Sequence, residues 1–473
     1  MIEGLQPYSE YKESGIPWSP HIPSGWGTER AKWLFTKMER PVRPEDEVVT
    51  CFRDGRVTLR KNRRLHGFTE AIVEAGYQGI RKGDLVIHAM DAFAGAVGVS
   101  DSDGKGTPVY SVCQPKRSAN PNYYANTVRE MSRARWILAI AKGIRERSTD
   151  FRFETFGNQR VPLPPPDEQA AIVRFLEHAN RKIDGFIRAK RKLIGLLNEQ
   201  KQAIIHRAVT CGLDPHAPLK PSGIPWLGDI PQHWEVRRLR TLVHRIDQGP
   251  CPQSDNFLAD GASWGVLKAG CVNRGVFREN EHKRVASHFA IDPAVVLKVG
   301  DVLVSRACGS PQLVGSVGKV ESLRFRLILG DKTFRPVFRD SVEVDFAVYA
   351  MNSPYFRLQV EQALSGAEGL ANNLPLSSLR DFILAIPPLR EANAIAGALR
   401  QELQQGNTAI ARTEREIALM QEYRTRLTAD VVTGKLDVRP AAAKIPALTP
   451  SSHEPATGEC GDETEPEEAD AEP

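Results

Sequence analysis

The residues with the clearest chemical potential are basic. Residues 60–64 read Arg-Lys-Asn-Arg-Arg, and further Lys and Arg residues recur between short apolar segments. Such side chains can contact phosphate groups, and arginine can pair bidentately with guanine in the major groove of DNA. They are candidate DNA contacts, although an ordinary solvated role is the more common one for any single residue. The candidates are Arg60, Lys61, Arg63, Arg64, Lys105, Lys268, Arg274, Arg306 and Lys332.

The distribution of charge also favours a polyanionic partner. The chain has 473 residues and a net charge of +5, but residues 445–473 contain nine acidic residues and no Lys or Arg. Residues 1–444 therefore carry about +14, which suggests nucleic acid binding, with a well-solvated surface as the alternative. Residues 439–473, rich in Pro, Glu, Ala and Thr, are predicted to be a disordered acidic tail.

Two patterns raise the alternative of an enzyme. Residues 120–123 (Asn-Pro-Asn-Tyr) resemble the Asn-Pro-Pro-Tyr motif of adenine methyltransferases, and residues 93–98 loosely resemble a glycine-rich cofactor loop. Only about 22 residues separate them, too few for the strands and helices of a nucleotide-binding sheet. A turn that opens a helix is the better interpretation. Gly98 to Lys105 is also no phosphate loop, because its glycines are one residue too far apart and Gly106 replaces the Ser or Thr. We predict no catalytic residues.

The other reactive side chains do not form recognisable sites. Seven cysteines are scattered without a CxxC pair, and no HExxH motif occurs, so neither disulfides, a metal site nor a cofactor is expected. No apolar run is long enough to span a membrane, and the N-terminus lacks the features of a signal peptide. The sequence predicts a cytoplasmic protein that binds no membrane.

An internal duplication organises the chain. SGIPWSPHIPSGW at residues 14–26 returns as SGIPWLGDIPQHW at 222–234, and the aligned segments 14–30 and 222–238 share nine identities in seventeen positions. Later blocks repeat as well, PPPDEQAAIVRFL at 164–176 and PPLREANAIAGAL at 387–399. The offset grows from 208 to 223, so the second variable segment has gained about fifteen residues.

The repeated blocks predict two long helices. Residues 167–208 and 390–432 contain no proline, and each follows a Pro-Pro pair. Apolar residues recur at spacings of seven, three and seven, as in a coiled-coil seam. Polar residues interrupt this seam at Lys190, Lys201, Thr413 and Arg424. The predicted helix-seam and partner-binding residues are Ile187, Ile194, Leu197, Ile204, Ile410, Ile417, Met420 and Leu427.

Between the helices, the variable segments read as mixed α/β domains. DLVIHAM, PVYSVC, GVLKAG and DVLVSRA are predicted strands, and GFTEAIVEAGYQ, REMSRARWILAIAKGIRER and FAVYAMNSPYFRLQVEQALS are predicted helices. Joining the end of the second helix to the N-terminus would recreate the central linker, so the repeat is cyclic and pseudo-twofold. The fold class is mixed α/β (α+β), with two globular domains separated by two long antiparallel helices that form a coiled coil.

These features together resemble the specificity subunits of type I restriction-modification systems. The resemblance rests on the duplicated SGIPW segments, Glu168-Gln169 after Pro-Pro, the Gly-Asp apolar blocks, and Asp103-Gly104 before Val109-Tyr110. It covers nearly the whole chain outside the acidic tail. One departure is Glu391-Ala392, where the pattern has Glu-Gln, and this puts the detail of the second helix junction in question.

The resemblance implies a division of labour along the chain. Two target-recognition domains would each read one half of an asymmetric, bipartite site in double-stranded DNA, with half-sites about one helical turn apart. The helices would fix the spacing and bind two methylation subunits, and motor-nuclease subunits would complete the complex. The expected segments are an N-terminal arm (1–23), recognition domain 1 (24–163), a central helix (164–210), a linker (211–231), recognition domain 2 (232–386), a C-terminal helix (387–438) and the tail (439–473).

In this interpretation the chain is a non-catalytic subunit, and methylation and ATP-dependent cleavage belong to its partners. The alternative is a duplicated coiled-coil scaffold that binds protein partners without DNA specificity. A scaffold would account for the repeat and the helices, but it leaves the basic, diverging domains unexplained.

Overall fold

A computed structural model describes residues 5–63, 75–116, 119–145, 148–273, 275–364 and 372–446. The chain divides into two compact units. Unit 1 comprises Met1–Ile187 and Ala418–Pro473, and unit 2 comprises Arg188–Ile417. Two long helices, α5 (Pro166–Cys211) and α10 (Leu389–Val432), each contribute to both units.

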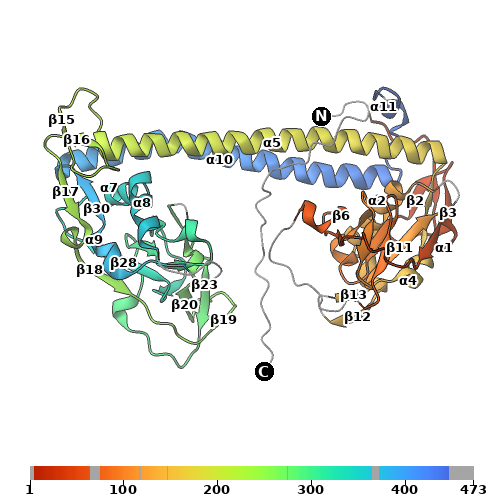
Figure 1. Cartoon of the computed structure of the whole chain (residues 1–473), viewed down its shortest axis with the longest axis horizontal. Helices are drawn as coiled ribbons and strands as arrows, with labels where there is room; N and C mark the ends of the chain where they lie inside the picture. Colours follow the sequence, from red (N-terminus) through yellow and green to blue (C-terminus); the bar gives the residue numbers. More distant parts are fainter. Residues whose placement is uncertain are drawn as a thin grey trace. The chain divides into compact units, whose positions relative to one another are not determined.

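Unit 1 is built on an antiparallel four-stranded sheet in the order β4-β11-β8-β9, of which β11 is labelled in Figure 1. Its described strands are β1 (Tyr11–Glu13), β2 (His21–Pro23), β3 (Gly27–Arg30), β4 (Phe35–Met38), β5 (Val49–Cys51), β6 (Val57–Leu59), β7 (Gln78–Ile80), β8 (Leu85–His88), β9 (Val97–Val99), β10 (Gly104–Gly106), β11 (Tyr110–Pro115), β12 (Lys142–Arg145), β13 (Ser148–Asp150) and β14 (Arg160–Leu163). Its shorter helices are α1 (Ala31–Leu34), η1 (Arg60–Asn62), η2 (Ala92–Ala94), α2 (Pro121–Arg133), α3 (Trp136–Ile140), α4 (Phe153–Gly157) and α11 (Arg439–Ala443).

Unit 2 contains an antiparallel four-stranded sheet in the order β18-β28-β24-β26. Its described strands are β15 (Leu219–Pro221), β16 (Asp229–Pro231), β17 (Glu235–Arg238), β18 (Val243–Gln248), β19 (Ser254–Asp255), β20 (Trp264–Leu267), β21 (Val272–Asn273), β22 (Val276–Phe277), β23 (His282–Val285), β24 (Val302–Ser305), β25 (Ala307–Cys308), β26 (Val317–Lys319), β27 (Arg326–Ile328), β28 (Thr333–Phe338), β29 (Asn372–Asn373) and β30 (Ile383–Ile386). Its shorter helices are α6 (Leu239–Leu242), η3 (Ala269–Cys271), η4 (Pro293–Val295), η5 (Pro311–Leu313), α7 (Val344–Met351), α8 (Pro354–Ala363) and α9 (Leu376–Asp381).

The two units repeat the same strand pairings in the same chain order. The hairpin β1-β2 corresponds to β15-β16, the pair β3-β14 to β17-β30, and the four-stranded sheets correspond strand for strand. The units differ in the chain segments between β4 and β11 and between β18 and β28. There unit 1 has the small pairs β5-β6 and β7-β10, whereas unit 2 has a second four-stranded sheet, β19-β23-β20-β27. The duplication therefore extends to the backbone, and the insertions are where the copies diverge.

The repeated SGIPW segments form the same turn in both units. Ser14 Oγ accepts a hydrogen bond from the Ile16 N–H at 2.8 Å, and Ser222 Oγ accepts one from the Ile224 N–H at 3.1 Å. The glycine between each pair has a positive φ, +66° at Gly15 and +73° at Gly223, which explains why glycine recurs there. The second tryptophan of each copy, Trp26 or Trp234, is buried in its unit's main core.

The long helices join these same cores. In unit 1 the start of α5 and the end of α10 pack with Trp26 through Ile172, Phe175, Leu176, Leu427 and Val431. In unit 2 the opposite ends pack with Trp234 through Ile205, Val209, Ile395, Leu399 and Leu403. Burial of apolar side chains at about 25 cal/mol per Å² makes each helix pair an integral part of its unit.

Polar contacts show that the helices run antiparallel in both units. In unit 1 the Arg424 guanidinium binds Asp184 of the facing helix. In unit 2 Lys190 Nζ lies 2.7 Å from Glu416 Oε2, and Lys201 Nζ donates to Asn407 Oδ1. Thus three of the predicted seam interruptions are cross-helix contacts. The fourth, Thr413, is buried and its hydroxyl donates to the Ala409 carbonyl at 2.7 Å.

The predicted seam is buried most deeply at one place. Ile187 and Leu427, both in unit 1, are fully buried. The remaining predicted seam residues are half-buried, namely Ile194, Leu197, Ile204, Ile410, Ile417 and Met420. A single pair of helices cannot enclose its own seam completely, because each apolar side chain has only one neighbouring helix to cover it.

Most predicted secondary structure agrees with the structure, with one clear exception. The four predicted strands correspond to β8, β11, β20 and β24. α5 extends the predicted span by one residue at its start and three at its end, and α10 by one residue at its start. The helix predicted over residues 129–147 is confirmed only in part, because residues 129–133 belong to α2 and residues 136–140 to α3. Its chain reverses at Arg135, which has a φ of +56°, and residues 142–145 form strand β12. Helix 346–365 is broken at Ser353-Pro354, and most of GFTEAIVEAGYQ lies outside the described residues.

No helix in the described part of the chain combines the length and apolar character needed to cross a membrane. The six cysteines within the described ranges are unpaired, and burial raises the pKa of the Cys51 and Cys271 thiols to about 12.

The SGIPW turn gives a test of the repeat's local structure. Gly223→Ala should lower the free energy of unfolding by about 1–2 kcal/mol, because an L-residue is strained at positive φ although the added Cβ meets no atom within 4 Å. Gly261→Ala is the matched control, since its Cβ also meets open space and its φ is not positive. It should be neutral or slightly stabilising. Equal effects of the two substitutions in urea unfolding would show that the turn conformation does not explain the conserved glycine.

Candidate nucleic-acid interface

Three of the predicted contacts cluster on one hairpin of unit 1. Strands β5 and β6 are joined by a turn at Phe52–Arg56, and η1 follows directly with Arg60 and Lys61. Lys61 Nζ lies 2.5 Å from Glu47, and Arg60 Nε donates to Thr50 Oγ1 at 3.4 Å. Arg63 pairs with Asp54 at 2.8 Å and stacks 4.4 Å above the Phe52 ring. Arg64 lies outside the described residues.

Lys105 lies next to this hairpin. It sits on β10, and its N–H donates to the backbone carbonyl of Glu47, the residue that pairs with Lys61, at 2.8 Å. The structure therefore brings Lys61 and Lys105 to one strip of backbone, although they are 44 positions apart in the sequence. Exposed ion pairs such as Lys61–Glu47 are worth only about 0–1 kcal/mol, so a phosphate can replace the carboxylate at little cost.

Other arginines of unit 1 are committed to the fold. Arg81 donates to both carboxylate oxygens of buried Asp46, at 3.0 and 3.1 Å, and its side chain is only 15% exposed. Arg40 pairs with Asp84, a carboxylate that is also buried. Breaking such a buried pair is strongly destabilising, because the remaining charge has no partner. These side chains stabilise the fold of unit 1.

In unit 2 the structure brings together two of the predicted contacts. The Arg306 N–H donates to the Lys332 carbonyl, and Arg306 Nη1 donates to the Asp331 carbonyl at 2.9 Å. Lys332 Nζ lies 3.2 Å from the Asp331 carboxylate. Half-buried Lys268 is at the end of β20, and within the described ranges no hydrogen bond or ion pair joins it to Arg306 or Lys332. Arg274 lies outside the described residues.

Sequence reasoning missed basic residues next to aromatic rings in unit 2, one of them exposed. Arg284 lies 5.3 Å from the Phe257 ring, which is 67% exposed, and pairs with Asp255 at 2.7 Å. Arg326 lies 5.9 Å from the Trp264 ring. Exposed aromatics beside arginine suit contact with nucleic acid. In the sequence, His-Lys-Arg-Val at 282–285 lies apart from the aromatic residues. Only the sheet β19-β23-β20-β27 brings them together.

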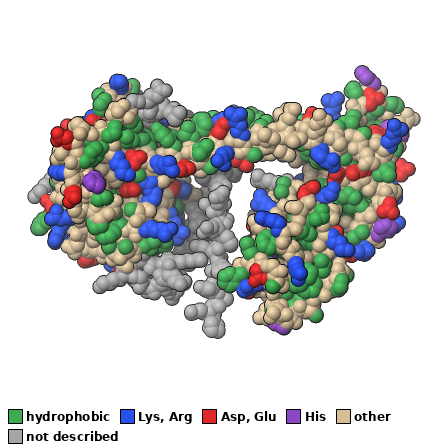
Figure 2. Space-filling view, turned by 180° about the vertical axis from the view of Figure 1, so that it is seen from behind, with side chains coloured by type: hydrophobic (Ala, Val, Ile, Leu, Met, Phe, Trp, Pro, Cys, Tyr) green, Lys and Arg blue, Asp and Glu red, His purple; other side chains and the backbone are tan. Residues whose placement is uncertain are grey.

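Charge of both signs covers the visible face of each unit (Figure 2). Lys and Arg side chains are interspersed with Asp and Glu, so the units lack a continuous single-sign field on that face. Among the described residues, no group of three or more His, Cys, Asp or Glu side chains could hold a metal ion.

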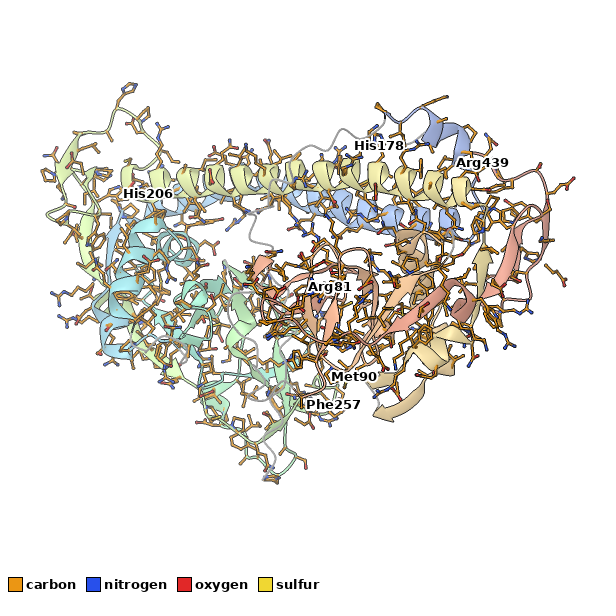
Figure 3. The ribbon with its side chains drawn as sticks, turned by 45° about the vertical axis from the view of Figure 1, so that its right-hand side comes forward. Arg81, Met90, His178, His206, Phe257 and Arg439 are labelled. Atoms are coloured by element: carbon orange, nitrogen blue, oxygen red, sulfur yellow. The ribbon has the colours of Figure 1, made fainter. Side chains whose placement is uncertain are left out.

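The start of α5 is docked by its Glu-Gln pair. Gln169 is buried, and its Oε1 accepts from the Asn120 N–H at 2.9 Å while its Nε2 donates to the Pro164 carbonyl at 2.8 Å. Glu168 accepts from the Tyr8 hydroxyl and lies 4.0 Å from Arg439, which sits beside this end of α5 (Figure 3). Burial, and then the hydrogen bond to Glu168, raise the pKa of Tyr8.

The start of α10 is docked by different contacts. Glu391, at the position of Glu168, accepts from Trp234 Nε1 at 3.1 Å and lies 2.6 Å from His233 Nε2. Ala392, at the position of Gln169, is buried in the apolar core. The departure from Glu-Gln in the sequence therefore marks a different docking contact, and the helix itself is retained.

The N-terminal arm closes the repeat within unit 1. The Asp437 N–H donates to the Gln6 carbonyl at 2.8 Å, and the Tyr11 hydroxyl donates to the Lys435 carbonyl at 3.0 Å. In unit 2 the equivalent hairpin, β15-β16, follows α5 without a break. The N-terminal arm thus forms in unit 1 the hairpin that the central linker forms in unit 2.

Comparison with known proteins agrees with this architecture. No protein-family model matches the chain. It is 26% identical over 288 residues to the type I restriction enzyme MjaVIII specificity subunit of Methanocaldococcus jannaschii, covering 60% of this chain and 64% of that protein. It is 28% identical over 162 residues to the type I restriction enzyme EcoEI specificity subunit of Escherichia coli, covering 34% and 27%. The matches span less than two thirds of the length of these curated relatives.

The fold is shared with a solved structure. A chain from a study of complex assembly and conformational transition of the type I R-M system aligns with a TM-score of 0.60 and 18% identity, covering 87% of this chain and 98% of that one. The curated homologues of this chain are type I restriction enzyme specificity subunits, as the sequence resemblance predicted. The expected mixed α/β fold with long helices is confirmed.

The docking of α5 can be tested at Gln169. Gln169→Ala should lower the free energy of unfolding by about 1–3 kcal/mol, because it leaves a buried N–H and a buried carbonyl without a partner. Gln421→Ala, an exposed position on the other long helix of unit 1, is the control and should stay within about 0.5 kcal/mol. If both variants unfold at the same urea concentration, the buried hydrogen bonds do not anchor the helix.

Proposed function

We propose that this chain is the DNA sequence-recognition subunit of a type I restriction-modification complex. Residues 24–163 and 232–386 would be the target-recognition domains, each reading one half of a bipartite, asymmetric site. The observation that carries the proposal is that both units use one strand order but differ in the segments inserted between β4 and β11 and between β18 and β28. A repeated scaffold with different insertions suits two readers of different sequence.

The charged residues support contact with DNA through those insertions. In unit 1 the candidate contacts Arg60, Lys61, Arg63 and Lys105 all lie on or beside the β5-β6 hairpin. In unit 2 Arg306 and Lys332 lie at adjoining ends of β24 and β28. Phosphate contacts of this kind fix the position of a protein on DNA, and base contacts from the same loops specify sequence. Residues Arg64, Lys268 and Arg274 belong to the same proposal.

The helices would set the spacing and receive the partner subunits. Apolar side chains remain exposed on them, Leu193 and Leu196 in unit 2 and Leu419 in unit 1. In unit 1 a groove of about 710 Å³ lies between α5, α10 and the segment around α11, and is lined by Phe175, Phe186, Met420 and Tyr423. Amphipathic helices of a partner dock into such grooves. Near-equivalent helices would suit two identical methylation subunits, with motor-nuclease subunits in the full cytoplasmic complex.

The chain itself would carry no catalytic step and need no cofactor. Methylation and ATP-dependent cleavage would come from the partner subunits, and this chain would determine where they act. A duplicated scaffold that binds only proteins is the alternative, and the two experiments below separate it from DNA recognition.

The first experiment maps methylated adenines in host DNA. Co-expression with a cognate type I methylation subunit should produce one motif of two short defined parts separated by a fixed run of unspecified bases. Omitting this chain is the control and should abolish that motif. A contiguous palindromic motif would rule out two different readers, and methylation that persists without the chain would favour the scaffold.

The second experiment neutralises the hairpin. Lys61→Gln with Arg63→Gln should weaken duplex binding and reduce the slope of log K against log salt by about two, since each lost phosphate contact removes about 0.9. The control is Lys12→Gln with Arg30→Gln, two exposed residues of unit 1 for which no side-chain ion pair is found within the described ranges. Fluorescence anisotropy at several salt concentrations measures both. If both double variants match the unmodified chain, the DNA contacts lie elsewhere or the chain is a scaffold.

A further inference from the structure

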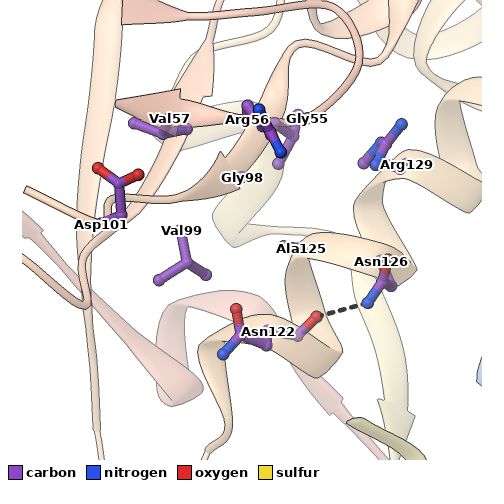
Figure 4. Close-up of a pocket in the computed structure, with 11 residues that line it drawn as sticks. Gly55, Arg56, Val57, Gly98, Val99, Asp101, Asn122, Ala125, Asn126 and Arg129 are labelled. Atoms are coloured by element: carbon purple, nitrogen blue, oxygen red, sulfur yellow. Dashed lines mark hydrogen bonds between the residues drawn. The ribbon is translucent and has the colours of Figure 1, made fainter. Parts of the chain in front are cut away.

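A small pocket of about 200 Å³ opens in unit 1 between three elements (Figure 4). The β5-β6 turn contributes Gly55 and Arg56, the strand β9 and the residues around it contribute Val97 to Val99 and Asp101, and α2 contributes a third wall. This pocket contains none of the predicted DNA contacts. It does contain Asn122, from the Asn-Pro-Asn-Tyr motif that opens α2.

The wall of the pocket that α2 contributes is polar. Asn122, Asn126 and Arg129 are four and three residues apart, so they lie on one face of the helix. Asn120 caps the helix by accepting from the Asn122 and Tyr123 N–H groups. Asn122, in the first turn of the helix, lines the pocket (Figure 4). Asn126 Nδ2 donates to the Asn122 carbonyl at 2.9 Å. Within the described ranges the Asn122 side-chain amide has no hydrogen-bond partner.

Arg129 is a half-buried cation with little compensation. Its guanidinium lies across Gly55, where an added Cβ would be 2.4 Å from Nη1, and Gly55 has a φ of +89°. No hydrogen bond or ion pair joins this guanidinium to another described residue. Burial lowers the pKa of Arg129, and the charge of Asp54 opposes that change. A half-buried guanidinium without a paired anion is incompletely solvated, and an anionic ligand in the pocket would offset that cost.

Arg56 provides a second, exposed guanidinium at the same pocket. It too has no side-chain hydrogen bond or ion pair within the described ranges. The neighbouring carboxylates are engaged elsewhere, Asp54 with Arg63 at 2.8 Å and Asp91 with Arg53 at 3.1 Å. Asp101 lines the pocket on the side away from Arg129, so it would confine an anion to the side of the arginines (Figure 4).

We propose that this pocket binds a phosphate group, and that its natural occupant is a backbone phosphodiester of the DNA held by unit 1. The proposal rests on the proposed function for the identity of the occupant, while the anion site itself rests on the two arginines. Arg56 and Arg129 supply charge-assisted donors, and the amides of Asn122 and Asn126 supply neutral ones. Because the pocket reads no base edge, it positions unit 1 on DNA without specifying sequence.

The site is tested first with inorganic phosphate on the full chain. Phosphate should raise the thermal unfolding temperature above that in chloride at equal ionic strength, and Arg56→Gln should remove the difference. Arg30→Gln is the matched control and should keep it. Asp101→Asn should increase the phosphate effect, because it removes the opposing carboxylate. A phosphate effect that is absent, or that Arg56→Gln leaves intact, overturns the anion site.

The occupant is tested with duplex DNA. Arg56→Gln should lower duplex affinity several-fold and reduce the salt slope by about 0.9, the value for one phosphate contact, while Arg30→Gln changes neither. Arg129→Gln should do the same, with circular dichroism confirming that the variant is folded. If the unmodified chain binds DNA and Arg56→Gln keeps its slope, the phosphodiester assignment is wrong although the proposed function stands. If the unmodified chain binds no DNA, the proposed function and this occupant both fail, and a retained phosphate effect leaves a site for a free phosphate.

Discussion

The structure depends on burying the ends of two long helices in two separate cores. In unit 1 the start of α5 and the end of α10 share a core with Trp26, and in unit 2 their other ends share a core with Trp234. A helix of more than 40 residues gains little from propensity alone, so this tertiary burial stabilises it. Because the ends are fixed by burial, the parts of the seam between them tolerate Lys190, Lys201 and Arg424, which bind partners on the facing helix.

The same constraint explains what the duplication kept and what it changed. The SGIPW turn, the tryptophan core and the helix junction all surround the buried helix ends, and all recur. The β5-β6 hairpin of unit 1 and the second sheet of unit 2 bury their apolar side chains in smaller clusters separate from the helix cores, and there the copies differ. The repeated parts thus contain the buried contacts that stabilise the fold, and the variable parts can differ in their binding chemistry.

Sequence reasoning predicted the features that depend on local pattern. The long helices follow from proline-free stretches with regular apolar spacing, and the strands from short apolar runs between turn residues. It failed where contacts between residues distant in the sequence determine the local structure. α2 ends at Arg133, and Arg135 with its positive φ begins a new helix, in which Trp136 Nε1 donates to Gln159 Oε1 at 3.1 Å and Ile137 enters the core. The sequence shows Glu168-Gln169 after a Pro-Pro pair, but it does not indicate that Gln169 binds Asn120.

The candidate site shows the same limit. A run such as residues 60–64 is visible as a cluster in the sequence, whereas Lys105 joins it only through the backbone of Glu47. Arg129 lies in a predicted helix, and nothing in that helix indicates that it faces Gly55, 74 positions earlier. Charge clusters that are contiguous in sequence can be predicted, while pockets assembled from a turn, a strand and a helix require the fold.

The central claim is that one repeated scaffold carries two independent readers of DNA. The most direct measurement exchanges residues 24–163 for the corresponding domain of a specificity subunit with a different methylation motif, and then maps methylated adenines in host DNA. The account predicts that one half of the motif changes, while the other half and the length of the unspecified run stay the same. A change in both halves, or in the length of that run, would contradict it.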